Sequence, residues 1–239
     1  PWNRAKRKPE KRKPVNMFRD MSRPFIERQE INMREIYFDN SATTKPYPEV
    51  VELMMKTLTE DYGNPSSKHT KGFDAEKYFR HAREQVAATL KVKPKEIFFT
   101  SGGTESNNTV IFGTAMAKRK QGKHIISSAF EHAAIYRPLD VLVELGYEVT
   151  YLPVNEYGLV SMEALSKELR PDTTLVTIML ANNEVGTIEP IYQIGKLLRE
   201  KRILFHTDAV QAYAQIPLSV QHDPIDLLSA SAHKFHGPK

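Results

Sequence analysis

Residues 124–154 read HIISSAFEHAAIYRPLDVLVELGYEVTYLPV, and this stretch decides the fold class. An apolar run, His124–Ser127, is followed by a break and by a helical pattern that starts near His132. A second strand-like run, Glu148–Val154, follows the helix. Two strands joined through a helix form a parallel pair, because a parallel pair needs a long crossover rather than a tight turn. The stretch therefore predicts an α/β fold.

The same order of strand, break and helix repeats on both sides of this stretch. Further strands are expected at Ile36–Phe38, Ile97–Thr100, Leu175–Leu180, Ile203–His206 and Asp226–Ser229. Further helices are expected from about Pro48, along the apolar stripe Ala75, Phe79, Ala82, Val86 and Leu90, and from near Thr104, Ser161 and Pro190. The repetition predicts a three-layer α/β/α fold with a mostly parallel sheet. Ligands of such sheets bind beyond the carboxyl ends of the strands, so residues there are the candidates for function.

Composition narrows the class of protein. Of the 239 residues, 40% are hydrophobic and 26% are charged, which is typical of a globular protein and argues against a fibrous or wholly disordered chain. No residue is cysteine, which excludes disulfides, thiolate metal sites and a cysteine nucleophile within this polypeptide. No apolar run approaches the roughly 18 residues of a transmembrane helix. A soluble, cytoplasmic protein is expected.

Positive charge is concentrated at the start of the chain. Residues 1–32 hold ten lysines and arginines against four acidic residues, whereas the rest of the chain is close to neutral. The sequence predicts a basic, disordered leader over residues 1–32 and one domain over residues 33–239. The leader has no apolar core, so it is not a secretory signal. Its basic run from Arg4 to Lys13 leaves a nucleic-acid-binding module open as an alternative function.

Polar residues follow several of the expected strands. The segment Ser101–Asn108, SGGTESNN, combines two glycines with Thr104 at a helix start, and it could either bind a phosphate or form a simple turn and cap. Asp208 follows a strand that looks buried, where a carboxylate needs a cation or a hydrogen-bond donor. Other candidates at strand ends are His132, Asn183, Gln211, Ser231, His233 and Lys234.

The combination is more informative than any single member. A pyridoxal phosphate site needs donors for a phosphate, a carboxylate for the ring nitrogen, a side chain against the ring and a lysine that forms an imine. The candidate residues include each of these chemical types. They predict pyridoxal 5'-phosphate as the cofactor and predict no metal site.

Seven motifs carry a resemblance to a known family. The chain resembles cysteine desulfurases of the NifS/IscS type, within the class V aminotransferase group of fold-type I pyridoxal phosphate enzymes. The sequence SAHK, residues 231–234, resembles the NifS/IscS branch more than the SufS-like branch, which tends to have SGHK. In chain order, the motifs are YFDNSATT (37–44), GNPSS (63–67), TSGGTESNN (100–108), EHAA (131–134), ANNEVG (181–186), HTDAVQ (206–211) and SAHKFHGPK (231–239).

The resemblance assigns a role to each candidate near the phosphate. It implies that the side chains of Thr104, Ser231 and His233 hold the phosphate and that the backbone of Gly103 assists. The domain over residues 33–239 would then be the large, cofactor-binding domain of this transferase fold.

The resemblance also assigns the candidates near the ring. Lys234 would form the covalent bond to the cofactor and move the Cα proton, and His132 would stack on the ring and help to move protons. Asp208 would pair with the ring nitrogen, which makes these three residues the implied catalytic set. Asn183 and Gln211 would contact the ring oxygen or the incoming amino acid.

The family's activity supplies further expectations. Its substrate is L-cysteine, whose sulfur passes to an enzyme cysteine and then to an acceptor protein such as an iron–sulfur scaffold or a tRNA-thiolation enzyme. A homodimer is expected for the full-length protein, with no membrane and no nucleic acid bound by the folded part. The family's cysteine, its carboxylate-binding arginine and a further phosphate ligand lie beyond Lys239, so we expect a truncated domain with partial activity or none.

Two further alternatives stay open at this point. One is another class V enzyme, such as a selenocysteine lyase or an aminotransferase, which shares the same cofactor chemistry. The other is a metal hydrolase whose ligands are His206, Asp208, His233 and His236, although no HExxH motif occurs.

Overall fold

The computed structural model describes residues 35–220 and 222–239. The leader expected over residues 1–32, and with it the nucleic-acid-binding alternative, lies outside the described residues. Contacts divide the chain into residues 1–38 and residues 39–239. In the described part of the chain, no helix is both long and apolar enough to cross a bilayer.

A five-stranded sheet forms the middle layer of residues 39–239. Its order is β2-β1-β3-β4-β5, and every neighbouring pair is parallel, as the repeated strand and helix pattern predicted. The strands are β1 (His124–Ser128), β2 (Glu148–Leu152), β3 (Thr173–Thr177), β4 (Leu204–Asp208) and β5 (Leu227–Ser229).

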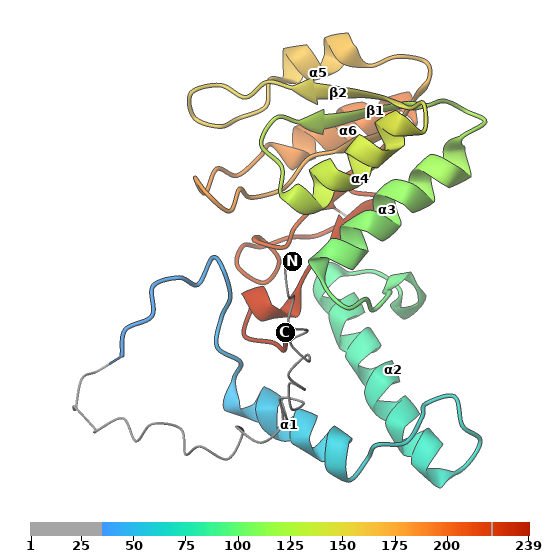
Figure 1. The fold of residues 1–239 in the computed structure, drawn as a ribbon, viewed down its shortest axis with the longest axis vertical. Coiled ribbons are helices and arrows are strands. Elements are labelled where there is room, and N and C mark those ends of the chain that lie inside the picture. The colour runs from blue at the N-terminus through green and yellow to red at the C-terminus, as the bar shows by residue number, and fades with distance from the viewer. Residues whose placement is uncertain (1–34, 221) are drawn as a thin grey trace, which may run out of the picture. The chain divides into compact units, whose positions relative to one another are not determined.

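Helices cover both faces of this sheet (Figure 1). The covering helices are α3 (Gly103–Lys118) and α4 (Ala133–Glu144) on one face and α5 (Met162–Glu168) and α6 (Ile191–Lys201) on the other. The helices α1 (Pro48–Thr59) and α2 (Thr70–Leu90) come earlier in the chain and do not cover the sheet (Figure 1), and short 3₁₀ helices lie at η1 (Pro94–Glu96) and η2 (Ala232–Lys234). The helices α3 and α4 lie side by side, and α5 contacts α6. The three-layer α/β/α architecture is confirmed.

The two hydrophobic clusters follow the alternation of side chains along the strands. Ile125 and Leu175 pack with α3 and α4 in one cluster. Their chain neighbours Ile126 and Val176 pack with α5 and α6 in the other cluster. Because successive strand residues point to opposite faces, these pairs supply apolar side chains to both layers, as a sheet buried on both faces requires.

Two expected strands are wrong. Residues 97–100 are not paired with a strand in the described part of the chain, and the side chain of Phe98 is 81% exposed. Ile97 and Phe99 instead line a cavity whose lining also includes Leu228 of β5. An apolar run becomes a strand only where a partner satisfies its backbone groups. The run Ile36–Phe38 is likewise exposed and unpaired in the described residues.

The apolar stripe of α2 is only partly buried. Ala75 and Leu90 are in contact with the core, whereas Phe79 is 40% exposed and packs against Phe99 and the guanidinium of Arg83. The periodicity predicted the helix correctly. It overestimated how much of the helix the rest of the described chain covers.

Candidate active site

Asp208 is the last residue of β4, at the carboxyl end of the sheet, and it is 4% exposed. Its Oδ1 accepts a hydrogen bond of 2.9 Å from the backbone N–H of Val210. Its Oδ2 accepts one of 2.6 Å from the Nδ2 amide group of Asn107, near the start of α3. The buried carboxylate thus has one donor on each oxygen, which offsets part of the cost of its burial.

Opposing influences set the pKa of Asp208. Burial is the largest and raises the pKa, while the hydrogen bonds from Val210 and Asn107 and the charges of His132 and Lys234 lower it. His132 and Lys234 therefore lie within electrostatic reach of the same carboxylate. The structure brings the three implied catalytic residues to one end of the sheet.

Lys234 lies at the end of η2 and reaches back to the segment that precedes α1. Its ammonium group donates hydrogen bonds to the backbone carbonyl oxygens of Ser41 and Ala42, the second at 3.0 Å. Burial lowers the pKa of Lys234, whereas the nearby carboxylates of Asp39 and Asp208 raise it. Partial desolvation of this kind makes a lysine a better nucleophile toward a carbonyl group.

The amino end of α3 forms the second part of the site. An added Cβ on Gly103 would lie 2.9 Å from Cγ2 of Val210 and 3.6 Å from Cβ of Ser231. The absence of a side chain at position 103 therefore lets the first turn of α3 approach the loop after β5. Helix N-termini present backbone N–H groups without intrahelical partners, and these attract anions. Thr104 follows directly and is exposed.

His233 is joined to the same segment as Lys234. Its Nδ1 lies 3.1 Å from the hydroxyl of Thr43, and its carbonyl oxygen accepts a hydrogen bond of 2.8 Å from the backbone N–H of Thr44. Burial is the main cause that lowers the pKa of His233, and the charges of Lys234 and Lys239 lower it further. The ring is therefore held as a neutral donor or acceptor.

A cavity of about 1900 Å³ opens beside the amino end of α3. Its lining includes the polar groups expected to hold a phosphate, and it also includes residues 97–100 and two leucines of β5, Leu227 and Leu228. The members that matter for the site are Gly102, Gly103, Thr104, Ser231 and His233. The four residues assigned to the phosphate therefore line one continuous space.

The remaining candidates differ in how closely they join the site. Gln211 donates a hydrogen bond of 2.9 Å from Nε2 to the carbonyl oxygen of Ser41, which Lys234 also contacts. His132 caps α4, because its Nδ1 accepts a hydrogen bond of 3.1 Å from the N–H of Ala134.

Asn183 stands apart from the other candidates. Its side chain donates a hydrogen bond of 2.8 Å to the neighbouring Glu184. In the described residues it donates none to the other candidates. The buried amide of the pair is Asn182, which donates 2.9 Å to the carbonyl oxygen of Phe130. Asn182 holds the loop, whereas the hydrogen bond of the Asn183 side chain stays within that loop.

A buried acid supports the loop that carries His132. Oε1 of Glu131 accepts hydrogen bonds of 2.5 Å from the Ser128 hydroxyl and of 2.9 Å from the N–H of Met179. Burial raises the pKa of Glu131 to about 8, more than these two donors lower it, so the group is mostly protonated at neutral pH. Glu131 thus connects the ends of β1 and β3 without adding a full negative charge beside Asp208.

Sequence reasoning missed two groups of residues at the site. One is Asn107, the hydrogen-bond donor to Asp208. The other comprises Ser41 to Thr44, whose carbonyl and hydroxyl groups bind Lys234 and His233. Both groups fall inside motifs quoted above. The motifs marked their neighbourhood, but no chemical type in them pointed to the individual contacts.

The contacts of His206 argue against the metal-hydrolase alternative. The two ring nitrogens of His206 lie 2.8 Å from the Thr177 hydroxyl and 3.1 Å from the Ser229 hydroxyl, so both are engaged. Burial lowers the pKa of His206 to about 3, which keeps the ring neutral. Within the part of the chain that the structure describes, no three metal-ligating side chains gather at one point.

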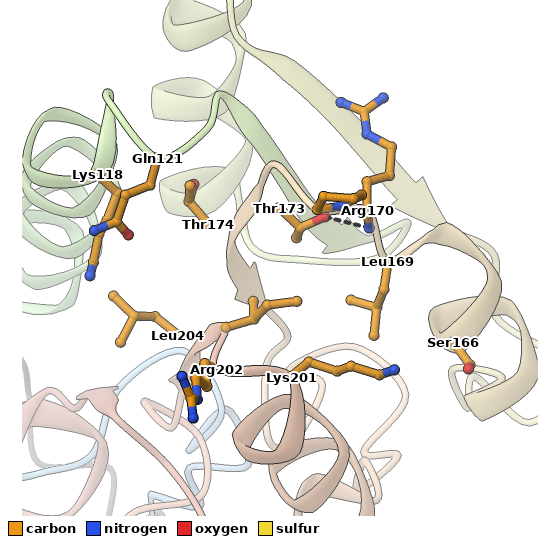
Figure 2. Close-up of a pocket in the computed structure, with 12 residues that line it drawn as sticks. Lys118, Gln121, Ser166, Leu169, Arg170, Thr173, Thr174, Lys201, Arg202 and Leu204 are labelled. Atoms are coloured by element: carbon orange, nitrogen blue, oxygen red, sulfur yellow. Dashed lines mark hydrogen bonds between the residues drawn. The ribbon is translucent and has the colours of Figure 1, made fainter.

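A smaller cavity of about 390 Å³ lies at the amino ends of β3 and β4 (Figure 2). It is lined by several cations, but the amines of Lys118 and Lys201 point away from one another. The guanidinium of Arg170 is already paired, at 3.1 Å to Asp172 and 2.6 Å to Glu148. This cavity therefore lacks the converging charges of an anion site.

The residues at the carboxyl end of the sheet fit pyridoxal phosphate. Gly103 lets the first turn of α3 lie close to Val210 and Ser231, and the helix N-terminus presents backbone N–H groups that could bind a phosphate. Asp208 offers a buried acceptor for a ring nitrogen, and Lys234 offers an amine within its electrostatic reach. These groups thus match the phosphate of the cofactor at one end and its ring and aldehyde at the other.

We predict that Gly103→Ala weakens binding of pyridoxal phosphate by about tenfold or more. The new Cβ would lie 2.9 Å from Cγ2 of Val210, so we expect the first turn of α3 to shift away from Val210 and to displace the phosphate donors. Equilibrium titration of the purified chain with the cofactor measures this loss.

Gly113 is the matched control, because it lies on the same helix and a Cβ there meets nothing within 4 Å. Gly113→Ala should keep full affinity and stabilise the helix by about 0.5–1 kcal/mol. Equal affinities of the two variants would contradict the assignment of the phosphate to this turn.

Comparison with known proteins identifies the family. Residues 36–239 match the family model described as aminotransferase class V. The chain is 52% identical over 206 residues to the cysteine desulfurase IscS of Dictyoglomus turgidum, which covers 86% of this chain and 52% of that protein. It is 46% identical over 207 residues to the mitochondrial cysteine desulfurase of Candida albicans, with 86% and 42% covered.

Solved structures give the same result. A NifS-like protein superposes with a TM-score of 0.84 at 44% identity, covering 86% of this chain and 57% of that one. A structure titled SspA in complex with cysteine superposes with a TM-score of 0.83 at 39% identity, covering 86% and 59%. The chain spans about half the length of the curated relatives it matches.

Proposed function

Because the chain belongs to the class V aminotransferase family, we propose that it provides the cofactor-binding half of a pyridoxal phosphate-dependent cysteine desulfurase. The observation that carries the proposal is the buried Asp208 within electrostatic reach of Lys234 and His132 at the carboxyl end of the sheet. Burying a charged carboxylate costs free energy unless a cation or a hydrogen-bond donor pairs with it.

The cofactor would be held at two ends. Gly103, Thr104, Ser231 and His233 would bind its phosphate, and Asp208 would hold a proton at its ring nitrogen. When bound, pyridoxal phosphate supplies an aldehyde that captures an amine and a ring that withdraws electrons from the substrate's Cα. An anionic Asp208 strengthens that withdrawal, because it keeps the ring nitrogen protonated.

Four side chains would handle the substrate. The amine of Lys234, the implied site of covalent attachment, would accept the Cα proton and return it. His132, fixed at the start of α4, would lie against the ring and move a second proton. Gln211 and Asn183 would orient the ring oxygen or the incoming amino acid from the loops after β4 and β3.

L-Cysteine is the proposed substrate, and a thiol is the proposed sulfur acceptor. L-Cysteine and a thiol would give L-alanine and a persulfide, so the carbon–sulfur bond breaks and a sulfur–sulfur bond forms. None of the 239 residues is cysteine, so the thiolate is supplied from outside them. An iron–sulfur scaffold or a tRNA-thiolation enzyme would take the sulfur onward. A homodimer and a cytoplasmic location remain predictions.

The test is turnover of L-cysteine by the full-length gene product. Equal amounts of alanine and of thiol-bound sulfur are expected, and both should depend on added pyridoxal phosphate. Selenocysteine turnover without cysteine turnover would indicate the lyase alternative. Formation of an amino acid from a keto acid would indicate an aminotransferase, and either result would overturn the proposal.

A further inference from the structure

Asn107 is a buried amide whose orientation is set by Asp208. It lies near the start of α3, is 1% exposed, and donates a hydrogen bond of 2.6 Å from Nδ2 to Oδ2 of Asp208. Its Oδ1 is also buried and has no hydrogen-bond partner in the described part of the chain. An unpartnered buried acceptor is destabilising. Asn107 therefore forms the hydrogen bond from Nδ2 to the Asp208 carboxylate even though its own Oδ1 is left without a donor in the described residues.

The groups around Asp208 act in opposite directions. Burial favours its neutral form, and the buried Glu131 carboxyl also lies within electrostatic reach. The backbone N–H of Val210 and the charges of His132 and Lys234 favour the anion. Asn107 is the side chain that donates a hydrogen bond to the carboxylate, and it does so at the oxygen that Val210 leaves free. Without Asn107, Oδ2 of Asp208 would stay buried and would lose the hydrogen-bond donor that it has now.

The residue before Asn107 makes a parallel contact. The hydroxyl of Ser106 donates a hydrogen bond of 2.9 Å to the Ser229 hydroxyl at the end of β5, which in turn lies 3.1 Å from Nε2 of His206. Consecutive residues of α3 therefore bind the ends of β4 and β5. Because the first turn of α3 is the proposed phosphate site, these contacts fix the spacing between that site and Asp208.

We propose that Asn107 is a positioning residue that keeps the Asp208 carboxylate charged and directed at the cofactor ring, in register with the phosphate-binding turn of α3. The role in catalysis rests on the proposed function. The effect of Asn107 on Asp208 does not, so the two can be tested separately.

The experiment is a carboxyl-carbon NMR titration of the chain labelled at aspartate, with the Asp208 signal assigned by its loss in Asp208→Asn. Asn107→Leu removes the donor at similar volume, and we expect it to raise the pKa of Asp208 by about one unit. Asn107→Asp keeps the shape and places a second carboxyl beside the first. We expect that pair to share a proton and to retain it to higher pH.

Asn108 is the matched control. It is the next residue on α3, and its side-chain amide donates a hydrogen bond of 2.7 Å to the carbonyl oxygen of Thr104 rather than to Asp208. Asn108→Leu should leave the Asp208 titration unchanged. In the full-length gene product, Asn107→Leu should lower kcat by about tenfold with little change in KM for L-cysteine, because the residue does not touch the substrate.

The outcomes separate the two proposals. An unchanged Asp208 titration in both Asn107 variants would overturn the role of Asn107, whatever the activity. A shifted titration in a protein that makes no alanine from cysteine would support the contact and refute the proposed function. A shifted titration with unchanged kcat would refute a role for the contact in catalysis.

Discussion

Lys234→Ala is expected to abolish covalent capture of pyridoxal phosphate by this chain. The amine of Lys234 lies within electrostatic reach of Asp208, and burial lowers its pKa, which favours attack on an aldehyde. Alanine offers no nucleophile at this position. Borohydride reduction followed by mass analysis of peptides should find the cofactor on Lys234 in the parent chain and on no peptide of the variant.

Folding and specificity need separate controls for this variant. Lys234 donates to the carbonyl oxygens of Ser41 and Ala42, but Gln211 also donates to Ser41, so the segment keeps a second contact. Circular dichroism should therefore show an intact fold. Lys196→Ala removes an exposed lysine of α6 and should retain full labelling. A borohydride-stable adduct in Lys234→Ala would show that another amine is the attachment site.

The sheet could be predicted from the sequence because its strands are buried on both faces. Runs such as Ile125–Ile126 and Leu175–Val176 send one apolar side chain to each helical layer, so they appear as short continuous apolar stretches. The starts of α4 and α5 lie where the sequence has capping residues. Ser161 and His132 both accept hydrogen bonds from the first turn of the helix that follows them.

Residues 97–100 show where this reasoning ends. The run is as apolar as the true strands, and its first residue has extended backbone angles. Strand formation also requires a neighbour, and in the described part of the chain no strand pairs with this run, which lines a cavity instead. Pairing depends on chain segments far apart in sequence, so local composition could not predict its absence.

The candidate site divides in the same way. Lys234, Asp208 and His132 could be singled out because their chemical types are unusual at strand ends and because their motifs resemble a family. Asn107 could not, since asparagine near a helix start is ordinarily a local capping residue. Its importance comes from a contact of 2.6 Å across 101 positions of sequence, which only the packing of α3 against the sheet creates.

Asp208→Asn is expected to leave the cofactor bound while slowing Cα deprotonation by about a hundredfold or more. The amide that replaces the carboxylate can still accept the hydrogen bond from Val210 through its oxygen. Its NH₂ group would meet the NH₂ group of Asn107, but Asn107 can rotate to present Oδ1, which has no partner in the described residues. The fold should therefore survive, and the loss should fall on the chemical step.

The measurement is the kinetic isotope effect and rate of Cα hydrogen exchange in the full-length gene product supplied with L-cysteine. Asp226→Asn is the control, because Asp226 also accepts a backbone hydrogen bond, 2.9 Å from the N–H of Phe205, but lies at the opposite end of β4. Asp208→Glu, which keeps the negative charge, should recover part of the rate. Unchanged exchange in Asp208→Asn would mean that the ring nitrogen needs no anion there, and the buried carboxylate would then serve only to hold α3 through its hydrogen bond with Asn107.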